Sequence, residues 1–293
     1  MSITFEQVSY TYAPLSRKRT HGDGSPVCSW AIRNIDFTLE DGEFFGIAGH
    51  TGSGKSTLLQ HMNGLIHPTF GRVLIDGQDL SNKKTTAKIR PKIGLVFQYP
   101  EQQLFATSVY DDIAFAPRNF GLSSQEAEER VREALAQVGL DFDRFSTMSP
   151  FELSGGQQRR VAFAGVLAMK PSVLILDEPV AGLDPIARGE FLELISSFHK
   201  QGMTIVMVSH SMNNLADFCD RILILKEGEQ FMLGTPSEVF AGESILTEMG
   251  LGVPSAQRLA NDLKAAGIPL EDILYNVEHL AADLAQHYRA TRS

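Results

Sequence analysis

The sequence has little cysteine, and the cysteines it has lie far apart. Cys28 and Cys219 are the only two among 293 residues. Thiols at this separation make neither a disulfide framework nor a zinc site of the usual spacing, so a reducing compartment is expected. Stability must then come from a hydrophobic core, and a chain of this length can bury a full one.

Long hydrophobic runs are also absent. The longest, Val161–Met169, ends at Lys170-Pro171 and falls well short of the about 18 residues that cross a bilayer. The N-terminal Met-Ser-Ile-Thr-Phe-Glu lacks a basic segment followed by an apolar one, so no signal peptide is expected. These absences still leave a membrane-protein partner open.

The sequence has no surplus of positive charge. Its net charge is −9, which argues against general nucleic-acid binding because that function needs a basic surface. One basic cluster, Arg17-Lys18-Arg19, falls in a segment at 13–28 that is predicted to be a loop. We interpret the cluster as part of a solvated loop, with a lipid-contacting patch as the alternative.

The apolar pattern predicts an α/β fold. Alternating residues at 2–12 and 30–40 indicate strands, the first of them at a sheet edge. Three short apolar runs are typical of buried parallel strands, and they are Phe44–Ala48, Val173–Leu176 and Thr204–Val208. Further strands are expected at Arg72–Asp76 and Ile93–Phe97, and in a hairpin over 221–233 that turns at Glu227-Gly228.

Two regions are expected to be helical. Residues from about 99 to 170 are predicted to form a helical subdomain inserted into the α/β core, with a capping box at Ser123 and Glu126. The pattern is helical again from Pro236, where an amphipathic stripe contains Val277, Leu280, Ala281, Leu284, Ala285 and Tyr288. We predict a main domain over 1–240 and a C-terminal helical extension over 241–293 with a regulatory or dimerising role.

A glycine-rich loop follows the strand at Phe44–Ala48. It satisfies G-x-x-x-x-G-K-[ST] between a strand and a helix, which is the context that a phosphate-binding loop requires. Lys55 is expected between the β- and γ-phosphates, and the Ser56 hydroxyl is expected on Mg²⁺. The residues expected to contact nucleotide are Gly49, His50, Thr51, Gly52, Ser53, Gly54, Lys55, Ser56 and Thr57.

A second phosphate-binding surface is predicted at Leu153–Gln157. Ser154, Gly155 and Gly156 begin a helix with free backbone N–H groups, which suits a phosphate, and Gln157 completes the motif. The chain therefore has two such surfaces, which need not serve the same nucleotide.

Polar residues follow the ends of three predicted strands. Asp177 is expected to hold Mg²⁺, and the neighbouring Glu178 is expected to polarise an attacking water as the general base. Gln98 could reach the metal and this water from a second strand end. His210, at a third, could contact the γ-phosphate.

Two further candidates have alternative interpretations. Asp184 precedes Pro185 at a predicted helix start and is an N-cap, an interface residue, or both. Tyr12 is predicted to stack on adenine. An ordinary exposed strand aromatic is the alternative, and Tyr10 competes for the same role.

In order and spacing these motifs resemble those of the ATP-binding-cassette (ABC) ATPases, over about residues 2–240. The resemblance implies a P-loop NTPase fold with a RecA-like core, an antiparallel β subdomain and a helical subdomain. It also implies a head-to-tail dimer, in which ATP on one subunit is covered by the signature Ser and Gly of the other. The matching motifs are the aromatic Tyr12, the Walker A loop Gly49–Thr57, the Q-loop Gln98, the signature Leu153–Gln157, the Walker B strand Leu174–Glu178, the D-loop Ala181–Asp184 and the switch His210.

A narrower resemblance is to the ATPase component of energy-coupling-factor (ECF) vitamin transporters, on Leu58–Leu65, Phe97–Phe105 and Phe151–Val161. Arg159-Arg160 and the long 13–28 loop are more similar to the second of the two non-identical ATPases in such complexes. Val180 departs from the usual Thr, with little effect expected.

The narrower resemblance implies a peripheral protein on the cytoplasmic face of the cell membrane. Its implied partners are a second, non-identical ABC ATPase, a transmembrane coupling protein and substrate-binding membrane proteins. Two alternatives stay open at this point. One is an ECF-like importer of cobalt or nickel ions. The other is a soluble ABC ATPase, although those usually carry two cassettes or a long coiled-coil insertion.

Overall fold

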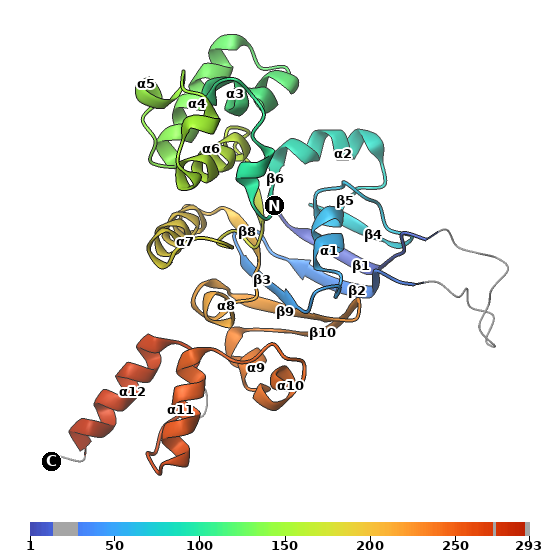
Figure 1. Cartoon of the computed structure of the whole chain (residues 1–293). Helices are drawn as coiled ribbons and strands as arrows, with labels where there is room; N and C mark the ends of the chain where they lie inside the picture. Colours follow the sequence, from blue (N-terminus) through green and yellow to red (C-terminus); the bar gives the residue numbers. More distant parts are fainter. Residues whose placement is uncertain (14–28, 272–273, 291–293) are drawn as a thin grey trace.

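The computed structural model describes residues 1–13, 29–271 and 274–290. Within them, one 10-stranded sheet has the order β5-β4-β1-β2-β10-β9-β3-β8-β7-β6. Helices α3 to α6 gather at one end of the molecule and α11 and α12 at the opposite end (Figure 1). Most of the loop predicted at 13–28, with Arg17, Lys18, Arg19 and Cys28, lies outside the described residues.

Parallel strands form the centre of the sheet. β3 (Phe44–Gly49) lies between β8 (Thr204–Val208) and β9 (Arg221–Lys226), and β7 (Val173–Asp177) and β6 (Ile93–Val96) follow beyond β8. Burial on both faces explains why β3, β7 and β8 are continuous apolar runs. The carboxyl ends of these strands meet at one edge of the sheet, because neighbouring strands run in the same direction.

The first strand has neighbours on both sides. β1 (Ile3–Tyr10) pairs with β2 (Ile32–Leu39) and with β4 (Phe70–Ile75), and β5 (Gln78–Asp79) forms the edge beyond β4. The prediction of an edge strand at 2–12 is therefore wrong. Alternation of apolar and polar residues reports which face of a strand is buried, and it carries no information about the number of neighbouring strands.

Stacked aromatic rings join the antiparallel strands to the parallel core. The ring of Phe37 on β2 lies 4.8 Å from that of Phe5 on β1 and 5.2 Å from that of Phe45 on β3. All three side chains are buried in one continuous hydrophobic cluster. On the other side of β9, β10 (Glu229–Gly234) completes the predicted hairpin through Glu227 and Gly228, which both have positive φ.

The helices that connect the central strands lie close to the strand ends. α1 (Lys55–Met62) follows β3 directly, α7 (Pro185–Lys200) precedes β8, and α8 (Met212–Phe218) follows it. These helices therefore begin or end next to the polar residues that the sequence places at the carboxyl edge of the sheet.

The region between β6 and β7 is mainly helical, as the sequence predicts. α3 (Val109–Asn119), α4 (Ser124–Gln137) and α6 (Gly155–Leu167) pack against one another. The predicted capping box is present, since Ser123 and Glu126 exchange both hydrogen bonds. Shorter elements complete the region: the turns η2 (Pro100–Gln103) and η3 (Pro150–Glu152) and the helix α5 (Phe142–Phe145).

Two helices, α8 and the more polar α2, have no counterpart in the sequence-based expectations. α2 (Lys83–Ile89), followed by the turn η1 (Arg90–Lys92), contains mostly polar residues, and only Thr86 and Ile89 are buried in it. The helix therefore lacks the apolar stripe that periodicity detects. Its local signal is the Asn82 side chain, which accepts a hydrogen bond from the Lys84 N–H.

The C-terminal helices belong to two clusters. α9 (Pro236–Phe240) and α10 (Glu243–Glu248) place side chains in the main core, which extends to Val253. α11 (Ser255–Ala265) and α12 (Val277–Ala290) share a small separate cluster around Ala260 and Leu280. The boundary at 240 stays a prediction. Within the ranges that the structure covers, no helix has both the length and the apolar composition that a membrane crossing requires.

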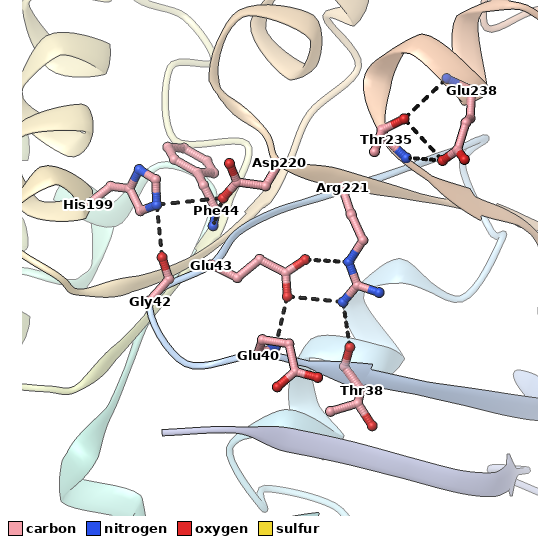
Figure 2. A network of polar contacts seen from close by, with 10 residues as sticks. All are labelled: Thr38, Glu40, Gly42, Glu43, Phe44, His199, Asp220, Arg221, Thr235 and Glu238. Atoms are coloured by element: carbon pink, nitrogen blue, oxygen red, sulfur yellow. Dashed lines mark hydrogen bonds and ion pairs between the residues drawn. The ribbon is translucent and has the colours of Figure 1, made fainter.

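A partly buried ion pair ties the turn before β3 to β9 (Figure 2). The Glu43 carboxylate accepts hydrogen bonds from Arg221 Nε at 2.7 Å and Nη2 at 3.0 Å. It also accepts the Glu40 N–H, and Arg221 donates to the Thr38 carbonyl. The Glu43 side chain is only 7% exposed and that of Arg221 is 32% exposed, so removal of Arg221 leaves the Glu43 charge with little access to water.

Arg221→Ala should therefore destabilise the fold. Breaking a buried pair leaves an uncompensated charge, and we expect a loss of about 2 kcal/mol because Arg221 keeps some contact with solvent. Urea denaturation measures the change. Arg72→Ala is the matched control, since Arg72 pairs with Glu6 on an exposed face, and a shift equal to that of Arg221→Ala would contradict this account.

His61, on α1, is a buried and neutral histidine. Its Nδ1 donates to the Thr57 carbonyl at 2.7 Å, and its Nε2 has no hydrogen-bond partner among the described residues. Burial lowers the pKa of His61 to about 4, with a smaller effect from His67 and an opposing one from the Thr57 bond. The folded protein therefore resists protonation of this ring.

The burial of His61 should make the stability of the protein depend on pH. Between pH 6.5 and 4 the unfolded chain takes up a proton that folded His61 does not, so the free energy of unfolding should fall by up to about 3 kcal/mol. In His61→Gln this part of the acid sensitivity should vanish, whereas His279→Gln, at an exposed position, should retain it. Denaturation at several pH values gives the slopes, and an unchanged slope in His61→Gln would contradict the assignment.

Candidate functional site

The carboxyl edge of the parallel strands contains a cavity of about 440 Å³. Its lining comes from distant parts of the sequence: Tyr12, Ala31, Thr51, Gly52, Gly54, Lys55, Ser56, Thr57, Gln98, Asp177, Glu178 and His210. All except Ala31 are sequence-predicted site residues. A larger hollow of about 800 Å³ lies over β1, β2 and β4 and contains none of them, so size alone does not identify the site.

The loop before α1 has a backbone that only glycine fits. Gly54 has φ +100 at the start of α1, and a Cβ there would lie 2.6 Å from the carbonyl oxygen of Ala31. A Cβ on Gly49 would lie 2.5 Å from the carbonyl of Leu225. These close approaches hold the loop in a curved conformation. In such a loop, successive backbone N–H groups can point inward and bind a phosphate. Ala31 contributes its backbone carbonyl to this close approach. Its methyl side chain carries no functional group, so the sequence gives no signal that Ala31 lines the cavity.

Lys55 points back into this loop. Its Nζ donates to the carbonyls of Gly49 at 2.6 Å and His50 at 2.8 Å. Burial lowers the pKa of Lys55, and the charges of Glu178 and Asp177 oppose that shift. The loop therefore holds a positive charge whose compensating carboxylates stand at the end of β7.

Ser56 and Asp177 form a pair of oxygen donors at the edge. The Ser56 hydroxyl donates to Asp177 Oδ2 at 3.3 Å. Burial raises the pKa of Asp177, whereas Ser56, Lys55 and His210 lower it. A hydroxyl and a carboxylate at this separation are the kind of ligands that Mg²⁺ prefers.

Glu178 is held in an unusual conformation. Its backbone is in the left-handed region with φ +49. This conformation is energetically unfavourable for a residue with a side chain, and such residues cluster at functional sites. The side chain is 14% exposed, and its Oε1 lies 3.4 Å from His210 Nε2. That contact lacks hydrogen-bond geometry, so this oxygen has no hydrogen-bond partner among the described residues. Burial, together with the charge of Asp177, raises the pKa of Glu178 to about 7.

The rings of the two candidate tyrosines are in edge contact at 4.9 Å, but only Tyr12 lines the cavity. The Tyr12 ring is exposed and lines the cavity, and its hydroxyl is 3.2 Å from Thr57 Oγ1. The Tyr10 ring also packs edge-on against His61 at 4.9 Å. Of the two, Tyr12 is the one that a ligand in this cavity would meet.

The signature segment lies outside this cavity. Ser154 caps α6 and exchanges hydrogen bonds with Gln157, so the Gln157 side chain is used within the chain. Gly155 and Gly156 are exposed at the helix start. These residues present free N–H groups to solvent rather than to the Walker A loop of their own chain.

Asp184, His50 and Ser53 are predicted site residues that also lie outside the lining of this cavity. Asp184 caps α7 by accepting the N–H groups of Ile186 and Ala187 at 3.0 and 3.1 Å, which is the N-cap interpretation. His50 and Ser53 line a second cavity of about 310 Å³ beside the end of α10. Ser53 Oγ is buried there without a hydrogen-bond partner among the described residues.

Comparison with known proteins identifies the family of this chain. A model described as "ABC transporter" matches residues 32–181. The energy-coupling factor transporter ATP-binding protein EcfA2 of Symbiobacterium thermophilum is 54% identical, over 91% of this chain and 90% of its own length. This chain belongs to the ABC transporter family. The EcfA2 protein of Caldanaerobacter subterraneus subsp. tengcongensis is 45% identical over the whole of both chains.

Solved ABC structures confirm the predicted fold class. CbiO1 of Clostridium perfringens, described as part of the ABC transporter complex cbiONQ, has a TM-score of 0.70 at 36% identity, over 89% of this chain and 98% of its own. The ATP-binding cassette MJ0796, solved as a dimer bound to ADP and Pi, has a TM-score of 0.67 at 31% identity, over 80% and 98%. As an ABC family ATPase, the chain binds ATP and hydrolyses it in connection with transport.

The role of Lys55 leads to a direct test. Lys55→Ala removes the only charge inside the loop, and we expect ATP affinity to fall by at least about tenfold, since charge-assisted bonds to phosphate are worth about 1.5–3 kcal/mol each. A fluorescent ATP analogue measures binding to the full chain. Lys200→Ala, at the exposed end of α7, should bind as the wild type does. Unchanged affinity in Lys55→Ala would show that the side chain does not contact phosphate.

Proposed function

We propose that this chain is the ATP-hydrolysing subunit of an ECF-type importer, which drives uptake of vitamins or similar micronutrients. The observation that supports the proposal is the separation of its two phosphate-binding surfaces. The Walker A loop and the Glu178 carboxylate share one cavity, whereas Ser154, Gly155 and Gly156 are exposed elsewhere. Each chain therefore has two half-sites, and a second ATPase completes both.

The cavity residues divide the work of hydrolysis. Gly49–Thr57 cradles the phosphates, with Lys55 placed at the β- and γ-phosphates. Ser56, Asp177 and Gln98 would hold Mg²⁺, which when bound would neutralise charge that develops on the phosphate oxygens. Tyr12 would stack on the adenine. His210 lies beside Glu178 and would contact the γ-phosphate.

Glu178 is the proposed general base. It accepts a proton from the water that attacks the γ-phosphorus, while the bond from that phosphorus to the ADP oxygen breaks. Its free Oε1 can accept this proton, and a pKa of about 7 suits a group that takes up and releases protons near neutrality. The burial of Glu178 and the unpaired Oε1 support this proposed role.

The second ATPase is proposed to be a non-identical subunit in a head-to-tail dimer. The solved MJ0796 cassette is described as dimeric, and the relatives named EcfA2 are ATP-binding proteins of energy-coupling factor transporters. In this arrangement Ser154, Gly155, Gly156 and Asp184 face the partner's nucleotide. The helices after residue 240 extend the same interface, as a regulatory or dimerising unit.

The transmembrane coupling protein is proposed to dock beside η2. Phe105 and Phe115 are exposed there with their rings in edge contact at 4.9 Å. An exposed aromatic pair on a polar surface is typical of a protein contact site. Through this contact the chain lies at the cytoplasmic face of the cell membrane, and substrate-binding membrane proteins in the same complex choose the cargo.

Glu178→Gln tests the general base. Turnover should fall by about 100-fold or more, the usual contribution of a positioned base, while ATP binding persists and the ATP-bound dimer accumulates. Single-turnover hydrolysis and size-exclusion chromatography measure both effects. Glu193→Gln, on the exposed side of α7, is the control. Near-normal turnover in Glu178→Gln would rule out this role.

The transport role is tested by isolating the chain from its native membrane through an affinity tag. We expect a second ATPase and a transmembrane protein to copurify. The substrate carried by the reconstituted complex separates vitamin uptake from cobalt or nickel uptake. A monomer with full ATPase activity and no membrane partner would contradict the proposal.

A further inference from the structure

Arg159, which no part of the proposed mechanism uses, is the most deeply buried member of an ion pair in the described residues. Its side chain is 4% exposed, and it binds the Glu101 carboxylate with two hydrogen bonds, Nε to Oε2 at 2.9 Å and Nη2 to Oε1 at 3.0 Å. Burial alone would raise the pKa of Glu101, but its bonds and the charge of Arg159 lower it. The pair is therefore ionised, with Arg159 buried and the Glu101 side chain 21% exposed.

The same guanidinium also holds the D-loop. Its Nη1 donates to the carbonyl of Ala181 at 2.9 Å and to that of Pro179 at 3.5 Å. All three of its nitrogens are thus engaged, and they join two segments far apart in sequence. A planar fork of this kind fixes both distance and direction, which a lysine ammonium does not.

The two joined segments also touch directly. A Cβ placed on Gly182 would lie 3.3 Å from Cε1 of Tyr99, and the Tyr99 ring centroid lies 6.0 Å from the Arg159 guanidinium. Tyr99 and Glu178 both have left-handed backbone, with φ +56 and +49. The surrounding contacts must hold these conformations in place, because each is unfavourable for a residue with a side chain.

Arg159 thus forms a bridge between Glu101 and the backbone at Pro179 and Ala181. Both ends of this bridge lie next to the cavity. Glu101 is in η2, which follows the cavity residue Gln98, and Pro179 immediately follows Glu178. The outer surface of η2 is exposed at Gln102 and Gln103. A contact that moves η2 would therefore move Glu101, and through Arg159 the backbone that carries Glu178.

We propose that Arg159, oriented by Glu101, is a positioning residue that sets the place of Glu178 and couples it to η2. The proposal rests on the role of Glu178 given above and deepens it. Loss of the bridge should reduce the chemical step and leave nucleotide binding intact, because the phosphate-contacting residues make no bond to Arg159 or Glu101.

Glu101→Gln is the main variant, since it keeps the size of the side chain and removes its charge. In the membrane-derived complex we expect kcat for ATP hydrolysis to fall about ten- to a hundredfold, the cost of a misplaced catalytic group, with KM within twofold. Glu190→Gln is the matched control. Glu190 pairs with Arg160, the next residue on α6, but at the surface, and both parameters should stay unchanged.

A second readout uses the full chain alone. Backbone hydrogen exchange over residues 180–184 should become faster in Glu101→Gln and remain as in the wild type in Glu190→Gln. Arg159→Lys should lower kcat as well, and the double variant Glu101→Gln/Arg159→Lys should lose no more than the worse single variant, because the two side chains act as one unit. If Arg159→Lys does not fold, Glu101→Gln decides by itself.

Wild-type kcat and wild-type exchange in Glu101→Gln would overturn the proposal. So would a rise in KM with kcat unchanged, or losses that add in the double variant. A wild-type complex without ATPase activity would instead refute the proposed function, and the exchange measurement on the full chain would still decide whether the bridge holds the D-loop.

Discussion

The parallel pairing of β6, β7, β8 and β3 is the constraint on which the site depends. Each strand contributes few polar atoms, and none of its residues could bind a nucleotide alone. Because the strands run in the same direction, the residues that follow them arrive at one edge, where the Walker A loop, Gln98, Asp177, Glu178 and His210 line a single cavity. A hydrophobic strand interior thus determines where the polar chemistry is placed.

Removal of water from that edge then determines the properties of the charged groups. Burial lowers the pKa of Lys55 and raises those of Asp177 and Glu178, and the opposite charges offset part of each shift. The same three groups at the surface would have ordinary acid–base behaviour. Their close packing gives neighbouring carboxylates different properties, which the proposed roles of Asp177 as metal ligand and Glu178 as base require.

Local signals predicted the parts of the fold that depend on local geometry. The phosphate loop needs glycines where the backbone approaches Ala31 and Leu225, and these glycines are visible as a motif. The capping box at Ser123 is equally local. The second neighbour of the strand at 2–12 and the wall formed by Ala31 depend on contacts with residues distant in the chain, so local signals could not predict them. The helix α2 was not predicted because it lacks an apolar stripe.

By itself, the sequence determined the motifs, the buried strands and the ABC family, since these depend on short spacings and on the apolar content of single segments. The tertiary structure decided which motifs meet. It brought Glu178 to Lys55, packed Tyr10 against His61 outside the cavity lining and left Ser154 facing solvent. It also placed Arg159 between η2 and the D-loop. The physical reason is that burial and pairing are properties of the folded chain, to which every strand contributes.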